Sequence, residues 1–201
     1  MADQSSMHSY LNWTKQRIDE MDATLASLEK KAGQVQAESK VKADQLIADM
    51  KKRRDEFQVL AKSQAQTAGA ALDASKAQLE SQWRDFEAKV NTYFDTAGKQ
   101  IEQQQATFRD VAAAQAKAWR QAADVFQSEI GKIATARRAN LDAAVKQMKA
   151  DAAEADARFN KLKQAGTDTW TALSAALADS RKAFDRANQK AGDALKSEKA
   201  A

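Results

Sequence analysis

Between Leu79 and Leu162 the chain places an apolar residue at every third or fourth position, in a sequence that contains no proline. Of 24 such positions 21 are apolar, and the 23 steps between them cover 83 residues. The period is therefore about 3.6 residues, which is the period of an α-helix. The residues in between are mainly Ala, Gln, Lys, Arg, Asp and Glu. The pattern predicts long helices with one narrow apolar stripe, which we call the seam.

The large residues of the seam are the candidates for an interaction surface. They are Leu79, Trp83, Phe86, Val90, Phe94, Ile101, Phe108, Trp119, Phe126, Ile130, Ile133, Leu141, Val145, Met148, Phe159, Leu162 and Trp170. Helices gain most of their stability from packing such a face, so the chain must fold back on itself or associate with another copy. We expect burial of Trp83, Phe86, Phe108, Trp119, Phe126, Leu141 and Phe159.

The composition supports an all-α fold. The 201 residues include no proline, six glycines and 30% charged residues, whereas aromatic residues make up 6%. This composition is typical of long helices in an antiparallel hairpin, a bundle or a coiled coil. Two architectures fit it equally: one fold-back near residue 96 with two long arms, or a bundle of three to five helices.

The seam continues toward the N-terminus through Leu11, Ile18, Met21, Leu25 and Leu28, so one elongated helical domain is expected. Polar, alanine-rich or glycine-containing stretches that weaken the seam mark its hinges. The expected organisation is a flexible leader at 1–9, a helical domain at 10–196 with hinges near 61–78, 92–98 and 163–169, and a frayed tail at 197–201.

The predicted helices lack the residue types and motifs on which most enzyme active sites depend. There is no cysteine, and the single histidine, His8, lies in the expected leader. A Ser-His-Asp arrangement or a di-iron bundle cannot be built without histidines on the helices. Neither a Walker loop nor a dinucleotide fingerprint is present. We expect a protein that is not an enzyme, with no catalytic residue, no cofactor and no metal site.

The net charge of +4 arises in the last third of the chain, which carries 14 basic and 9 acidic residues between 131 and 201. The candidate anion contacts are the two arginine pairs, Arg53-Arg54 and Arg137-Arg138. Acidic residues such as Asp55 and Glu56 offset this charge, so a solvated helix face is the preferred interpretation and nucleic-acid binding the weaker one. No apolar run is long enough to span a membrane, and no secretory signal pattern precedes the helices, so a cytoplasmic location is expected.

About half of the chain, from Gln100 to Lys196, resembles two groups of surface-coating proteins. The stretches Gln-Gln-Gln-Ala-Thr-Phe108, Ala-Ala-Ala-Gln-Ala-Lys-Ala-Trp119-Arg-Gln and Ala-Arg-Arg-Ala-Asn-Leu141-Asp-Ala-Ala resemble the amphipathic helices of bacterial phasins, which coat storage granules. An 11-residue spacing of seam residues is similar to that of apolipoprotein helices: Phe86, Ala97, Phe108, Trp119, Ile130, Leu141 and Ala152. The resemblance implies binding to a lipid or polymer surface.

The seam itself is narrow, with about one large residue per turn, which suits helix–helix packing better than a broad membrane-binding face. We therefore expect a non-enzymatic helical scaffold or interaction protein. Its expected partner is a second copy or another helical protein, bound through the seam. The alternative is a phasin-like or apolipoprotein-like protein that spreads the same seam on an apolar surface.

Overall fold

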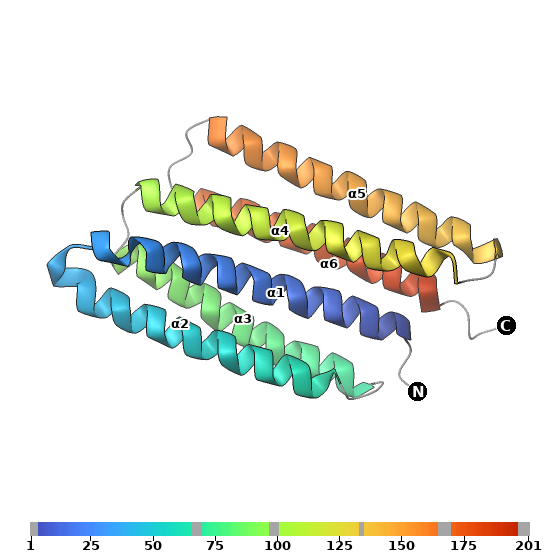
Figure 1. The fold of residues 1–201 in the computed structure, drawn as a ribbon, viewed down its shortest axis with the longest axis horizontal. Coiled ribbons are helices and arrows are strands. Elements are labelled where there is room, and N and C mark those ends of the chain that lie inside the picture. Colours follow the sequence, from blue (N-terminus) through green and yellow to red (C-terminus); the bar gives the residue numbers. More distant parts are fainter. Residues whose placement is uncertain (1–3, 66–69, 97–100, 133–134, 165–169, 197–201) are drawn as a thin grey trace.

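The chain forms six α-helices that lie side by side along the long axis of the molecule (Figure 1). The computed structural model describes residues 4–65, 70–96, 101–132, 135–164 and 170–196. These residues contain no strand, which confirms the all-α prediction. The elements are α1 (Gln4–Lys31), a short 3₁₀ turn η1 (Ala32–Gln34), α2 (Ala37–Gln64), α3 (Ala70–Thr96), α4 (Ile101–Ile130), α5 (Thr135–Gln164) and α6 (Trp170–Lys196).

The six helices form two groups of three. Helices α1, α2 and α3 pack against one another and are called the first unit here, and α4, α5 and α6 form the second unit. Consecutive helices alternate in direction along the long axis, as the chain colours show (Figure 1). The grouping follows the apolar clusters, whereas the most extensive packing of α1 is against α4, and α1 also packs along α6, so this helix joins the two units. The contacts are those of a helical bundle, and the coiled-coil alternative stays a prediction.

Each unit has an apolar core of its own. In the first unit one continuous cluster runs from Tyr10 on α1 through Phe57 on α2 to Phe94 on α3. The second unit has two clusters, one around Trp119, Phe126 and Phe184, the other around Phe108 and Phe159. The seam residues expected to be buried are all buried, which confirms that prediction: Trp83, Phe86, Phe108, Trp119, Phe126, Leu141 and Phe159.

The start of the first helix differs from the expected seam, whereas Met21, Leu25 and Leu28 further along it are buried as expected. Tyr10 and Trp13 face the core, whereas Leu11 is 46% exposed, so its assignment to the seam was wrong. The expected leader at 1–9 was also wrong in part, because α1 begins at Gln4. Met7 packs against the first core, and the Ser9 hydroxyl donates a hydrogen bond to the Asn188 carbonyl oxygen at 3.3 Å.

Helices end within each of the three expected hinges. Helix α2 ends at Gln64, α3 at Thr96 and α5 at Gln164, and the residues that connect them to the next helix lie outside the described part, as does the tail at 197–201. The sequence did not predict the turns after α1 and α4. After α1 the chain turns through η1, and Val35 is extended with φ −72° and ψ 136°.

The two units match each other residue by residue at a spacing of 98 positions. Helix α2 begins at Ala37 and α5 at Thr135, 98 positions later, and the bounds of the other helix pairs agree within two residues of that spacing. Buried core positions coincide in the same way, as in Leu28 and Phe126, Met50 and Met148, Leu79 and Leu177, and Phe86 and Phe184. The chain is therefore built as a tandem pair of equivalent three-helix units.

Candidate functional site

A network of buried charged residues lies where α1, α3, α4 and α6 meet. Its centre is Glu20 on α1, whose carboxylate accepts hydrogen bonds from Arg181 Nη2 at 2.8 Å and Nε at 3.2 Å. The second terminal nitrogen of Arg181 donates to Glu87 on α3 at 2.7 Å. Glu20 is 0% exposed and Arg181 8% exposed, so this pair is held away from solvent by the surrounding helices.

Gln115 on α4 completes the environment of Glu20. Its amide nitrogen donates to Glu20 Oε2 at 3.1 Å and to the Leu177 carbonyl oxygen on α6 at 3.1 Å. A buried carboxylate is tolerated only when its lone pairs are satisfied, and here one arginine and one amide supply the donors.

A second arginine crosses from α1 to α6 beside this centre. The guanidinium of Arg17 binds both carboxylate oxygens of Asp185, at 2.7 and 3.1 Å, in the two-pronged geometry that suits this pair. The Trp83 ring lies near both guanidiniums, 5.6 Å from that of Arg17 and 4.5 Å from that of Arg181. Cation–π attraction therefore adds to the ion pairs.

The network holds two guanidiniums and three carboxylates, and its electrostatics differ between the two arginines. Desolvation lowers the pKa of Arg17 below its ordinary value, although Asp185 and Glu20 act in the opposite direction. For Arg181 the desolvation is outweighed by Glu20 and Glu87, which raise its pKa above the ordinary value. Arginine side chains are not deprotonated in proteins, so both guanidiniums carry their positive charge.

Polar contacts extend from the network along most of the boundary between the units. The Ser27 and Thr107 hydroxyls are 3.1 Å apart, and Asn12 donates to Asn188 at 3.2 Å. The apolar clusters, by contrast, lie inside the units, and the aromatic contact across the boundary is that of Phe94 with Trp170, at 4.3 Å between ring centroids. The boundary is thus largely polar, while each unit is apolar inside.

A groove opens beside the network, between α3 and α6, with α1 and α4 as its floor. Its volume is about 240 Å³, and Arg181 and Glu87 bridge its walls. The large apolar side chains that line it are Trp83, Phe86, Val90, Val111, Trp170 and Leu177. Four of them, Trp83, Phe86, Val90 and Trp170, belong to the predicted seam. Trp83, Phe86 and Val90 are buried beneath the groove, and Trp170 is partly exposed.

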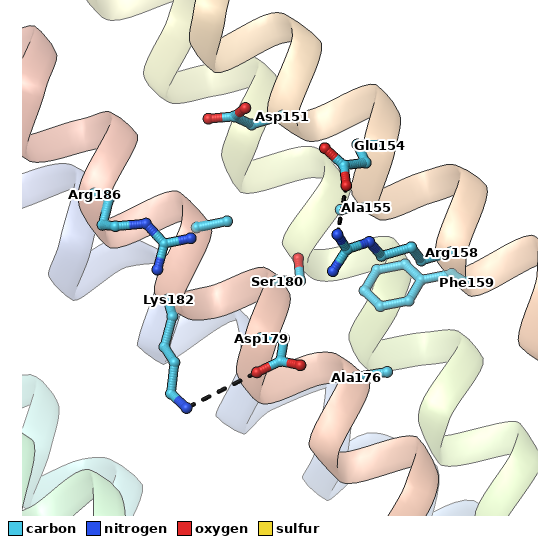
Figure 2. Close-up of a pocket in the computed structure, with 11 residues that line it drawn as sticks. Asp151, Glu154, Ala155, Arg158, Phe159, Ala176, Asp179, Ser180, Lys182 and Arg186 are labelled. Carbon is cyan, nitrogen blue, oxygen red and sulfur yellow. Dashed lines mark hydrogen bonds and ion pairs between the residues drawn. The ribbon is translucent and has the colours of Figure 1, made fainter.

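A second cavity of about 220 Å³ lies between α5 and α6 (Figure 2). Its walls carry three acids and three bases, namely Asp151, Glu154, Arg158, Asp179, Lys182 and Arg186. Glu154 pairs with Arg158 along α5, and Asp179 with Lys182 along α6 at 3.8 Å, as the dashed lines show (Figure 2). The excess acid on α5 is balanced by the excess base on α6, so this cavity presents no net charge to a ligand.

Most of the remaining seam residues are covered by helices of the same chain. Phe94, Leu141, Val145 and Met148 are buried, Ile130 and Leu162 are partly buried, and Ile101 is 48% exposed. The side chain of Ile133 lies outside the described residues. An interaction through the whole seam would therefore require the units to open.

The candidate anion contacts do not form a common patch. Arg53 lies 3.5 Å from Glu56, and Arg54 pairs with Asp22 and with Asp55. Arg138 is exposed on α5, and the side chain of Arg137 lies outside the described residues. The acids that pair with Arg53 and Arg54 reduce their attraction for an anion, as the sequence had indicated.

Sequence reasoning missed Arg17, Glu20 and Arg181, although one of them left a signal. The seam of the last helix runs from Leu177 to Phe184, and the position one turn after Leu177 is Arg181. A charge at a core position of an otherwise regular seam indicates a buried partner, and Glu20 is that partner.

The described residues contain neither a membrane-spanning helix nor a metal-binding cluster. No helix among them has the length and apolar character needed to cross a bilayer. They also contain no group of three or more His, Cys, Asp or Glu side chains placed to hold a metal ion. Comparison of the chain with protein-family models, with curated proteins and with solved structures found no match.

Proposed function

We propose that the protein is a non-enzymatic helical interaction protein, and that its partner inserts an apolar side chain into the groove between α3 and α6. The observation that carries the proposal is the apolar lining of this groove, to which Trp83, Phe86, Val90 and Trp170 contribute, with Trp170 partly exposed. Among the described residues, Trp170 is the aromatic side chain that is partly exposed, whereas the other Trp, Phe and Tyr side chains are buried.

The size of the groove supports a protein partner. Pockets for small-molecule ligands usually measure about 300–1,000 Å³, and this groove, at about 240 Å³, is smaller. Protein interfaces concentrate their binding energy in a few anchor side chains that fill small apolar pockets.

Site-specific photocrosslinking tests the groove as the binding element. A photoreactive residue replaces Ser174, which lines the groove, or Ser128 on α4 as the matched control. Both serine hydroxyls bond the carbonyl oxygen three residues earlier, at 3.1 and 2.8 Å, so both sit in similar helical settings. We expect a crosslinked product from position 174 that is absent at position 128.

The crosslinking experiment is repeated with a variant in which the groove is filled by a larger side chain. Ala178→Phe adds a ring to a residue that lines the groove, and Ala172→Phe adds the same ring elsewhere on α6. The product formed at position 174 should disappear with Ala178→Phe and persist with Ala172→Phe. Identical products from positions 174 and 128, or a product insensitive to Ala178→Phe, would contradict the groove as the binding element.

A second candidate function is the coating of an apolar surface, as the resemblance to phasins and apolipoproteins implies. It is favoured by α4 and α6, which carry all their large buried residues on one face and are rich in alanine elsewhere. Such helices can exchange their partners in a bundle for a lipid or polymer surface.

Flotation with liposomes or polymer granules at low and high salt tests the coating function. Salt-resistant co-flotation together with a blue shift of tryptophan emission would support it. Binding that is lost in salt would instead indicate charge contacts of the basic last third, because counterions screen such contacts. Absence of binding at both salt concentrations would rule the coating function out.

A further inference from the structure

The buried network occupies the same four positions in both units. At the spacing of 98, Arg17 corresponds to Gln115, Glu20 to Ala118, Trp83 to Arg181, and Glu87 to Asp185. Seven of these eight side chains belong to the network or its cation–π contacts, and the eighth, Ala118, is buried beside them. Each unit therefore contributes the same patch of its surface to the boundary.

The ion pairs of this network all run from one unit to the other. Arg17 of the first unit binds Asp185 of the second, and Glu20 and Glu87 of the first unit bind Arg181 of the second. The units share these positions, but they do not dock as a two-fold symmetric pair. Helix α1 packs along α6, whereas the corresponding helices α4 and α3 make no comparable contact.

The boundary between the units is ionic, whereas the core inside each unit is apolar. The apolar clusters that stabilise each unit lie almost entirely within that unit, with Trp170 and Ala23 as the residues that pack across. Separation of the units would thus expose the ionic patch while most of the apolar core stays covered. The patch of each unit is complementary in charge to the opposite unit of the same chain, and a second copy of this chain supplies the same complement.

We propose that this patch is a docking surface for a second copy of the chain, formed by reciprocal exchange of units. The first unit of one chain docks on the second unit of its partner, and the partner does the same in return, so both boundaries are rebuilt from two chains. The groove walls, α3 and α6, belong to different units, and in the exchanged dimer each groove is shared between chains. This goes beyond the groove-binding function and does not depend on it.

Complementary charge reversal tests the exchange on the full-length chain. In the Arg17→Glu variant the new carboxylate faces that of Asp185, and in the Asp185→Arg variant the new guanidinium faces that of Arg17. In each variant alone, like charges therefore repel each other across the boundary between the units. An exchanged heterodimer of the two variants contains one wild-type pair and one reversed pair, and both are attractive. Mixing the variants should therefore yield a species with twice the mass of the 22.0 kDa chain.

Native mass spectrometry of the mixture, with one variant carrying a mass tag, identifies the heterodimer. We expect the heterodimer to be about tenfold more abundant than either homodimer, because the coupling energy of one close charge pair corresponds to a ratio of about this size. The double variant Arg17→Glu/Asp185→Arg restores the attraction within one chain and should fold as the wild type does by circular dichroism. It thereby shows that the single variants fail through charge and not through loss of the helix fold.

A charge pair inside one unit provides the matched control. Asp49 on α2 and Lys89 on α3 lie 3.2 Å apart within the first unit, so exchange of whole units cannot rebuild a reversed pair. A mixture of Asp49→Lys and Lys89→Asp should show no excess of heterodimer. A mixture of Arg17→Glu and Asp185→Arg that stays monomeric, or forms no more heterodimer than this control, would overturn the exchange.

Discussion

Glu20→Ala is expected to lower the free energy of unfolding by about 3–5 kcal/mol, the usual effect of removing one partner from a buried ion pair. The change leaves Arg181 buried with only Glu87 as its counter-charge, and it removes an acceptor from the Gln115 amide. Urea unfolding followed by far-UV circular dichroism measures the loss. An unchanged slope with a shifted midpoint would show that stability, and not compactness, has changed.

An exposed glutamate is the control for this substitution. Glu154 pairs with Arg158 on the surface of α5, where both side chains are 62% exposed, so Glu154→Ala should cost at most about 0.5 kcal/mol. The double variant Glu20→Leu/Arg181→Met should recover most of the stability lost in Glu20→Ala, since apolar residues can replace a whole buried pair. Equal losses for Glu20→Ala and Glu154→Ala would contradict the energetic role of the network.

Phe126→Ala should destabilise the protein by a similar amount, about 3–5 kcal/mol, because it removes a ring from a packed core. Phe126 is 0% exposed and lies in the cluster of Trp119 and Phe184, whose rings meet edge to face at 5.1 Å. The cavity left behind should also alter the emission of Trp119. Thermal unfolding by circular dichroism, read together with tryptophan fluorescence, measures both effects.

An apolar residue on the surface is the control for the core substitution. Val59 on α2 is 69% exposed, so Val59→Ala should change stability by no more than about 0.5 kcal/mol. A melting temperature that is the same for Phe126→Ala, Val59→Ala and the wild type would show that the aromatic residues of the second unit are not a folded core.

The helical class and most of the core could be predicted because both depend on a local period. Residues such as Trp83, Phe108 and Phe126 recur at helical spacing, and that spacing alone places them on one buried face. The number of helices could not be predicted in the same way. Each new helix resumes the same apolar period after its turn. The pattern is therefore uninterrupted at the turns after α1 and α4, and it does not reveal that a helix ends there.

The network was harder to predict because its members are distant in sequence. Arg17 and Asp185 are 168 positions apart and Glu20 and Arg181 are 161 apart, so no local pattern links them. What decides their burial is the packing of α1 against α6, which depends on how the two units dock. The sequence contained the 98-residue correspondence, but it becomes visible only once the helix bounds identify which positions to compare.

One feature of the cores limits which parts of the two units are interchangeable. On α2 the aromatic ring is Phe57 and its neighbour one turn later is Ala61, whereas the corresponding residues of α5 are Ala155 and Phe159. Large and small residues are thus swapped, so α5 in the place of α2 would leave a void at one level and a steric clash at the next. The core residues of each helix therefore fit only the other helices of its own unit. Whole units can be exchanged between chains without a packing defect, whereas single helices cannot.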